Sequence, residues 1–366
     1  MKIFSTKRFD KILLLVLFLI FGIGLMLVAS ATKMSMRKLT IQGAAFFLGL
    51  IFMYLSTAID YSVLKKYDWY LYALSIIFLL LVYIPGFGIE QFSARSWVNL
   101  YFMQFQTSEA TKVTYTLAYS AFLERRRNQL NSIGEVLPAI LYPLPIVFLL
   151  KKQPDLGGIL VIFFITIFCL FMAGLNKKYI IGGIVFMLIA VPIIYKFQLL
   201  ESHQMQRLEA FLHPGDPSYI GNEQVIQSIT AIGSGQLFGK GWLKGTLIPF
   251  GFLPVPESDF IFAVLGEEFG MVGMGTLIAL FFVFLSRIYS IAMGAKDFYG
   301  TLIVSGFLGM LFYQVLQNIG MTIGLMPVTG VTLPFVSYGG SSVMMGMVIV
   351  SIIMNVYGKS HSSFAY

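Results

Sequence analysis

Acidic side chains that could do chemistry stand out in an otherwise apolar chain. Asp155 lies in the sequence QPDLGG at 153–158, and Asp259 lies in PVPESDF at 254–260. Aspartate is ionised at pH 7, so either carboxylate is able to accept a proton from a hydroxyl group or to hold a cation. Each aspartate also precedes an apolar run, where it would cap the N-terminus of a helix. The catalytic and the capping explanations both stay open.

Further charges lie inside apolar runs. Glu109 and Lys112 are three residues apart, on one face of a helix, and either form an internal ion pair or face a substrate. Glu267 and Glu268 follow Asp259 by 8 and 9 residues, which is about 12–14 Å along a helix. Adjacent acids at that depth cannot both face lipid. We expect them to bond to the backbone, to pair with a base such as Lys112, or to line a cavity.

Two other segments have irregular patterns. The sequence MPVTGVTLPFVSYGGSS at 326–342 brings two prolines into an apolar run, and such backbone at membrane depth is buried in protein or lines a cavity. Its GGSS end lets a helix or a ligand approach closely, so helix packing is the alternative to ligand binding. In the loop sequence SARSW at 93–97, Trp97 is either a site residue or only an interfacial anchor.

Several chemistries are excluded. The chain has no Gly-x-x-x-x-Gly-Lys-Ser/Thr phosphate loop, no Asp-x-Asp pair, and no serine–histidine arrangement suited to hydrolysis around GSG at 233–235. One cysteine, Cys169, and three histidines argue against disulfide, iron–sulfur and zinc sites. We expect no nucleotide, no haem and no nucleic acid as ligands, and an activated substrate would arrive attached to a membrane lipid.

The elements that position these residues are membrane helices. Of 366 residues, 57% are hydrophobic and 11% are charged, whereas soluble domains have about 25% charged residues. Continuous apolar runs indicate helices rather than a barrel. The sequence therefore predicts an all-α polytopic membrane protein, one domain over 1–366, with about ten spanning helices of about 20 residues. They are expected at 12–31, 39–58, 69–85, 106–123, 134–150, 155–174, 178–196, 259–287, 299–322 and 335–357.

The loops between these segments indicate an orientation. Lysines and arginines concentrate at the ends of alternate segments, so both termini are predicted on the cytoplasmic side. The connection over 197–258, between the seventh and eighth helices, then forms a large outer loop. The polar fourth segment is expected to face a wet cavity. The first apolar run is longer than that of a signal peptide, so we expect an uncleaved helix.

Four motifs resemble the signatures of the SEDS family (shape, elongation, division and sporulation). They are FQTSE at 105–109, QPDLG at 153–157, SDFIFAVLGEE at 258–268 and PVTG…LPFVSYGGSS at 327–342. The motifs occur in the family's order, and the resemblance extends over nearly the whole chain. The short N-terminus is more similar to the elongation members, RodA, than to the division members, FtsW.

The resemblance implies a peptidoglycan glycosyltransferase of the bacterial plasma membrane that serves cell-wall elongation and cell shape. It would polymerise lipid II into β-1,4-linked glycan strands, release undecaprenyl diphosphate, and work beside a class B penicillin-binding transpeptidase. The family's essential acid corresponds to Asp259, on the outer face. Substrate-binding residues would be Asp155, Trp97, Glu109, Lys112, Arg95, Ser337 and Ser341. The chain departs from the family's usual residues at Ser258, Thr107, Ser93 and Gly158-Ile159.

An α-linked sugar diphosphate gives a β product by one in-line displacement, so the expected reaction is inverting. Asp259 would act as general base for the acceptor 4-hydroxyl. Cations would stabilise the departing diphosphate, with Arg95, Lys112, Arg207, Lys240 and Lys244 as candidates. A divalent cation, magnesium or manganese, is a further candidate without assigned ligands. The alternative functions are a flippase or transporter of lipid-linked precursors, and a scaffold that only recruits the transpeptidase.

Overall fold

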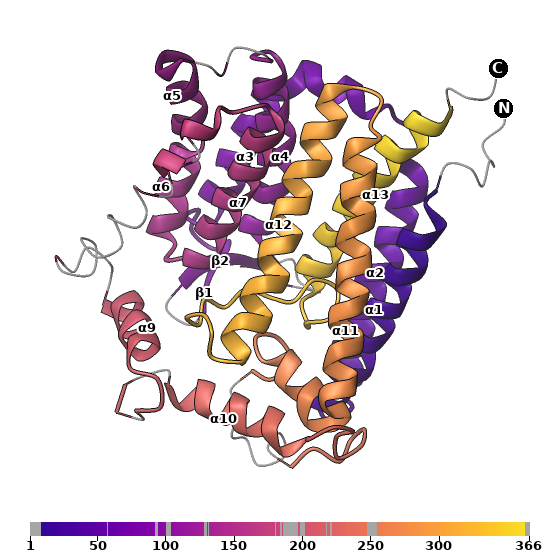
Figure 1. Ribbon diagram of the computed structural model, residues 1–366, viewed down its shortest axis with the longest axis vertical. Helices are drawn as coiled ribbons and strands as arrows, with labels where there is room; N and C mark the ends of the chain where they lie inside the picture. The colour runs from indigo at the N-terminus through magenta and orange to yellow at the C-terminus, as the bar shows by residue number, and fades with distance from the viewer. Residues whose placement is uncertain are drawn as a thin grey trace.

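The computed structural model describes residues 9–56, 58–91, 94–99, 104–127, 130, 132–179, 181–183, 185, 197, 202–216, 218–219, 222–246 and 255–362. Helices make up most of this part, and one small antiparallel sheet accompanies them (Figure 1). In chain order the elements are α1 (Lys11–Ala31), α2 (Met36–Ser56), the 3₁₀ helix η2 (Tyr61–Tyr67), α3 (Asp68–Leu81), β1 (Gly88–Gln91), β2 (Ala94–Asn99), β3 (Gln104–Gln106), α4 (Thr107–Glu124), α5 (Ile133–Leu141), α6 (Leu144–Lys152), α7 (Leu156–Met172), α9 (Ser202–Leu212), α10 (Asn222–Ser234), α11 (Ile261–Met293), α12 (Phe298–Thr322) and α13 (Gly340–Ser362).

Six helices in the described residues are long and apolar enough to cross a membrane. They are Lys11–Ala31, Met36–Ser56, Ile133–Lys152, Ile261–Met293, Phe298–Thr322 and Gly340–His361. The prediction of a polytopic helical membrane protein is confirmed, whereas the number of ten crossings is not. The segments predicted at 69–85 and 155–174 form shorter helices, α3 with 14 and α7 with 17 residues. The segment predicted at 178–196 lies mostly outside the described residues.

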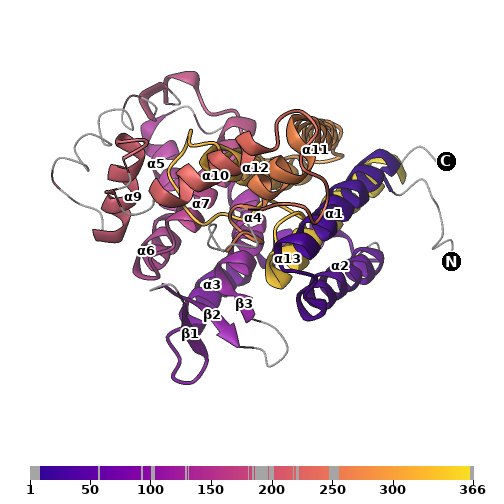
Figure 2. The same ribbon diagram turned by 90° about the horizontal axis from the view of Figure 1, so that it is seen from below.

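Helix α4 lies at the centre of the bundle, in contact with α3, α7 and α12 (Figure 2). Nearly all of its side chains are buried, including the charged ones. Its hydroxyl groups find partners in the bundle: Thr114 bonds to Ser75 and Tyr115 bonds to Thr166, each at 2.7 Å. The expectation that this helix faces a wet cavity is therefore wrong. Protein surrounds the helix and satisfies several of its hydroxyl groups, whereas the hydroxyls of Ser108 and Ser120 are buried without a partner among the described residues.

Several ion pairs lie at one end of the bundle. Ion pairs join neighbouring elements at the end where α1 begins and α13 finishes (Figure 1): Lys65 with Glu124, Arg125 with Asp68, Arg287 with Asp10, and Lys359 with Asp60. The sheet, α9 and α10 lie towards the opposite end. The first end thus contains basic clusters that the sequence assigns to the cytoplasmic side.

The regions between the helices differ from the predictions in three ways. The segment expected as a loop before α4 forms the sheet β1–β2–β3, so an all-α description is wrong there. The connection over 197–258 contains the helices α9 and α10. The last spanning helix begins at Gly340 rather than at residue 335, because Phe335 has a left-handed backbone with φ 63°.

Helix α11 is interrupted at Gly270, whose φ is 63°. The break leaves carbonyl groups without partners in the helix, and a segment after α10 supplies these partners. The Lys240 amide donates to the Glu267 carbonyl at 3.0 Å, and the Gly241 amide donates to the Glu268 carbonyl at 2.9 Å. The segment after α10 is therefore anchored to α11 by backbone hydrogen bonds.

The two acids next to this break also have side-chain partners. Glu267 pairs with Lys240 at 2.7 Å, and Glu268 accepts a hydrogen bond from Ser30 of α1. Lys112, the base suggested as their partner, does not pair with either of them. That part of the expectation is wrong, because the partner comes from the outer connection rather than from α4.

Candidate active site

The backbone that leads into α11 is held by other elements at three successive positions. Each carbonyl accepts one hydrogen bond: Glu257 from the Tyr338 amide at 2.7 Å, Ser258 from the Ser337 hydroxyl at 2.6 Å, and Asp259 from the Asn318 side-chain amide at 3.0 Å. The donors come from the end of α12 and from the segment before α13. The backbone at Asp259 is thereby fixed by the end of α12 and by the segment before α13, both of which are distant from it in sequence.

Asp259 does not cap α11. The helix begins at Ile261, and its N-cap residue is Phe260, so the capping explanation for Asp259 is wrong. One carboxylate oxygen, Oδ1, accepts a hydrogen bond from the Ser258 hydroxyl at 2.9 Å. A Cβ atom added to Gly330 would lie 3.7 Å from the other oxygen, Oδ2. The residue as a whole is only partly buried, which would let a substrate approach it.

The pKa of Asp259 lies above the ordinary range for aspartate, chiefly because burial disfavours the charged form. The hydrogen bond from Ser258 and the positive charge of Arg207 lower this pKa, and the negative charge of Glu257 raises it. A carboxylate whose pKa lies closer to neutrality is a better general base. The setting of Asp259 therefore suits proton abstraction.

Asp155 caps α7, as the sequence suggested. Its Oδ1 accepts a hydrogen bond from the Gly158 amide at 2.7 Å. Its Oδ2 has no hydrogen-bond partner among the described residues. The fold thus satisfies one carboxylate oxygen of Asp155, whereas the other is buried without a partner in the part of the chain that the structure describes.

The short segment 329–331 lies between the two acids. Gly157, two residues after Asp155, approaches this segment so closely that an added Cβ atom would lie 3.0 Å from the Thr329 carbonyl oxygen. The next residue of the segment, Gly330, borders the carboxylate of Asp259. The segment 329–331 therefore connects the start of α7, which Asp155 caps, with the carboxylate of Asp259.

The irregular backbone between α12 and α13 was expected either to be buried in protein or to line a cavity. In the structure much of it is buried in protein. Side-chain amides satisfy its carbonyl groups: Asn318 donates to Val331 at 2.8 Å, Gln317 to Pro327 at 2.8 Å, and Gln42 to Ser337 at 3.2 Å. The sequence analysis missed these three amides. The signal that could have identified them is the presence of polar amides in the apolar helices α2 and α12.

Ser337 and Ser341, both predicted to bind substrate, are buried. The Ser337 hydroxyl accepts a hydrogen bond from the Leu333 amide at 2.9 Å and donates to the Ser258 carbonyl. Ser341 lies in the first turn of α13. Substrate contact stays a prediction for both residues, and for Ser337 the hydrogen bonds indicate a positioning role.

Trp97 and Arg95 lie in β2. Trp97 is half-buried and pairs with Ile89 of β1 and with Gln106 of β3, the residue directly before α4. The sheet therefore links this tryptophan to the start of the central helix. The side chain of Arg95 lies outside the described part of the structure. Substrate binding by these two residues stays a prediction.

Glu109 and Lys112 form an ion pair inside α4, with 2.6 Å between Oε1 and Nζ. Each side chain is only 6% exposed, so the pair is desolvated and each charge depends on the other. The internal ion pair is confirmed, and a role in substrate binding stays a prediction.

Among the candidate cations in the described residues, Arg207 is the one whose positive charge lowers the pKa of Asp259. It projects from α9, is exposed, and donates from Nη1 to the Val328 carbonyl at 3.1 Å. Lys112 and Lys240 are each engaged with a glutamate. The structure thereby distinguishes Arg207 from the other cations that the sequence offered.

A divalent cation would have few protein ligands here. Among the described residues, no group of three or more His, Cys, Asp or Glu side chains is arranged to hold a metal ion. Magnesium is commonly bound by one or two carboxylates together with the phosphates of a substrate. The buried, unpartnered Oδ2 of Asp155 is the candidate ligand for that arrangement.

Known proteins resemble the chain over nearly its full length. The family model described as cell cycle protein, FtsW/RodA/SpoVE, matches residues 10–362. The peptidoglycan glycosyltransferase MrdB of Escherichia coli strain K12 is 35% identical over 350 residues, which cover 95% of this chain and 93% of MrdB. The probable peptidoglycan glycosyltransferase FtsW of Trichlorobacter lovleyi is 34% identical over 366 residues, which cover 97% of this chain and 94% of that protein.

The backbone is similar to a solved structure as well. One chain of a peptidoglycan synthase complex, described as coordinating polymerization and crosslinking, superposes with a TM-score of 0.84. The two chains are 30% identical, and the superposition covers 96% of this chain and 98% of the other. The similarity therefore includes both the helical bundle and the segments that form the site.

Proposed function

The chain belongs to the FtsW/RodA/SpoVE family, the SEDS proteins, and we propose that it is a peptidoglycan glycosyltransferase. Its substrate is lipid II, which it polymerises into β-1,4-linked glycan strands with release of undecaprenyl diphosphate. The observation that carries this proposal is the placement of Asp259. Its carboxylate has a raised pKa and is fixed through three backbone hydrogen bonds at the mouth of α11.

The chemistry requires a base at this position. The 4-hydroxyl group of the acceptor sugar attacks the anomeric carbon of the donor, and Asp259 takes the hydroxyl proton as the new bond forms. The bond from the anomeric carbon to the diphosphate breaks in the same displacement, so an α-linked donor gives a β product. A positioned general base contributes about 10²–10⁴ in rate.

The departing diphosphate needs positive charge. Arg207 is exposed and acts on the same carboxylate, so it is suited to stabilise this charge. Asp155 would hold a magnesium or manganese ion through Oδ2, and the ion would neutralise phosphate charge. Asp155 also orients the start of α7 through its cap.

The protein would act in the bacterial plasma membrane with both termini in the cytoplasm. Support comes from the distribution of lysines and arginines along the sequence and from the location of α9, α10 and the start of α11 at one end of the bundle. A class B penicillin-binding transpeptidase would crosslink the product. The structural neighbour in a peptidoglycan synthase complex supports such a partner.

Within the family, we assign the chain to the elongation members. Its identity with MrdB is 35% and with the FtsW of Trichlorobacter lovleyi 34%, so a cellular test decides the assignment. Depletion of an elongation enzyme would give round cells, whereas depletion of a division enzyme would give filaments.

Incubation of lipid II with the purified protein tests the function directly. Gel analysis of the product, with magnesium, with manganese and with a chelator, should reveal glycan strands and the dependence on metal. Liposomes loaded with lipid II in one leaflet provide the test of the alternative. Movement of lipid II across the bilayer without formation of polymer would favour a flippase and contradict the polymerase.

A further inference from the structure

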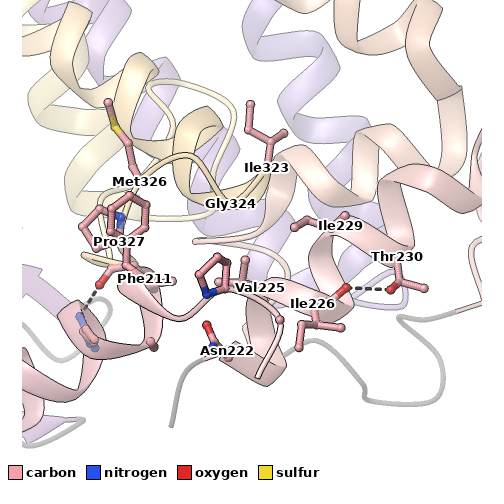
Figure 3. Close-up of a pocket in the computed structure, with 15 residues that line it drawn as sticks. Phe211, Asn222, Val225, Ile226, Ile229, Thr230, Ile323, Gly324, Met326 and Pro327 are labelled. Atoms are coloured by element: carbon pink, nitrogen blue, oxygen red, sulfur yellow. Dashed lines mark hydrogen bonds between the residues drawn. The ribbon is translucent and has the colours of Figure 1, made fainter. Parts of the chain in front are cut away.

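A cavity adjoins the candidate active site, between α9, α10 and the end of α12 (Figure 3). Its volume is about 240 Å³. Its walls are largely apolar and come from three elements: Phe211 from α9, Val225, Ile226 and Ile229 from α10, and Ile323 and Met326 from the end of α12 and beyond. The cavity lies at the end of the bundle where α11 begins.

The uncharged polar groups of this cavity are occupied by the protein itself. The Asn222 side-chain amide donates to the carbonyls of His213 and Asp216, at 2.8 and 2.9 Å. The Thr230 hydroxyl donates to the Ile226 carbonyl at 2.7 Å (Figure 3). The interior is therefore suited to hydrocarbon, since it presents few free donors to a sugar or a peptide.

The charged group at this cavity is Arg207. Its guanidinium group has five N–H donors and uses one of them on the Val328 carbonyl, so donors remain for an anion. Val328 also lines the cavity and directly precedes the segment 329–331 that borders Asp259. Arg207 thus lies where the cavity meets the proposed catalytic site.

We propose that this cavity binds the first isoprene units of a polyprenyl diphosphate, and that Arg207 binds its diphosphate group. The inference rests on the proposed function, whose donor and product both contain such a lipid. A largely apolar cavity of about 240 Å³ suits a short stretch of hydrocarbon. A cation beside an apolar cavity complements an anion attached to hydrocarbon.

The surrounding surface would give a lipid access to this cavity. Several apolar side chains of the outer connection are exposed, among them Leu212 at 49%, Phe238 at 79% and Trp242 at 41%. Leu212 lies on α9, whereas Phe238 and Trp242 follow α10. Exposed apolar and tryptophan side chains are typical of contact with the membrane interface. The diphosphate of a lipid carrier lies at that depth, because its tail is in the bilayer.

Binding of radiolabelled farnesyl diphosphate to the purified full-length protein in nanodiscs tests the proposal, with farnesol and inorganic diphosphate measured separately. Arg207→Gln removes the cation, and Ile229→Trp fills the cavity from a position that is 46% exposed, where a larger ring is tolerated. We expect the affinity of each variant for farnesyl diphosphate to be at least about tenfold lower than that of the wild type. Farnesol binding should fall only in Ile229→Trp, and diphosphate binding only in Arg207→Gln.

Matched controls are Lys296→Gln and Ile278→Trp, at exposed positions that do not line the cavity; both should bind farnesyl diphosphate as the wild type does. Wild-type binding by Arg207→Gln and Ile229→Trp would overturn the proposal. Equal affinity of the wild type for farnesol and farnesyl diphosphate would assign the cavity to a neutral lipid and also overturn it. A change in oligomeric state in Ile229→Trp, with unchanged binding, would assign the cavity to a second copy instead.

Polymerisation of lipid II by the same preparations separates this inference from the proposed function. If the wild type polymerises lipid II and both cavity variants bind farnesyl diphosphate as tightly as the wild type, the proposed function stands and the inference is refuted. A wild-type protein that binds farnesyl diphosphate through Arg207 and forms no polymer refutes the function.

Discussion

The Ser337 hydroxyl donates a hydrogen bond of 2.6 Å to the carbonyl of Ser258, a residue 79 positions earlier in the chain. This bond fixes the backbone directly before Asp259, the proposed general base. The Ser337 hydroxyl itself is oriented by the Leu333 amide. The position of the carboxylate is therefore determined by the segment before α13 as much as by α11.

Replacement of Ser337 by alanine tests this positioning role. The variant loses a donor to Ser258 and leaves the Leu333 amide buried without its acceptor, which should lower the free energy of unfolding by about 1–3 kcal/mol. We expect kcat for polymerisation to fall with little change in KM, because the base moves while the substrate contacts remain. Ser290→Ala, at an exposed position on α11, is the control. A raised KM at unchanged kcat would assign Ser337 to substrate binding instead.

Asp155 has a structural role as a helix cap and a proposed chemical role as a charged ligand. Replacement by asparagine distinguishes the two roles. Asparagine caps helices about as well as aspartate, so Asp155→Asn should unfold at the wild-type temperature. Loss of the charged oxygen should reduce polymerisation about tenfold or more. Asp297→Asn, at the corresponding cap of α12, is the matched control and should retain activity. Wild-type polymerisation by Asp155→Asn would mean that Asp155 is only a cap.

The fold shows which features the sequence predicts and which it does not. Long apolar runs predict α1, α2, α11, α12 and α13, because twenty apolar residues have few alternatives to a membrane helix. The sheet before α4 escaped prediction because its strands are short and are stabilised by pairing with one another rather than by a local pattern. The polarity of α4 was recognised, but only the packing of neighbouring helices shows that protein surrounds it.

The site shows the same division. The two aspartates were identified from their type and their place beside apolar runs, and Asp155 caps its helix as expected. The partners of Glu267 and Glu268 could not be predicted, because they depend on the break at Gly270, which brings the outer connection against α11. Tertiary contacts of this kind have no signature in the local sequence.

The ion pair inside α4 predicts a particular pattern of stability. Glu109→Gln or Lys112→Met alone leaves one charge buried without its partner and should destabilise the protein by about 3–5 kcal/mol. The double variant removes both charges and should be more stable than either single variant. Thermal unfolding in detergent measures the three effects. Single variants that unfold like the wild type but lose polymerisation would indicate substrate binding rather than packing.

The raised pKa of Asp259 predicts the pH dependence of the reaction. The base is active when ionised, so kcat/KM should fall as the pH is lowered through a pKa above that of an ordinary aspartate. Ser258→Ala removes a hydrogen bond that lowers this pKa, and the acid limb should move to higher pH. Ser258→Thr retains a hydroxyl and should keep the wild-type profile. An acid limb that stays in place in Ser258→Ala would contradict the assignment of this limb to Asp259.

The most direct test of the account is the polymerisation rate of Asp259→Asn. Asparagine has nearly the same shape and keeps the backbone hydrogen bond from Asn318, so the variant should insert into membranes and unfold like the wild type. We predict that its rate on lipid II falls by about a hundredfold or more, the contribution of a positioned base. Glycan strands formed at the wild-type rate by a correctly folded Asp259→Asn would contradict the account.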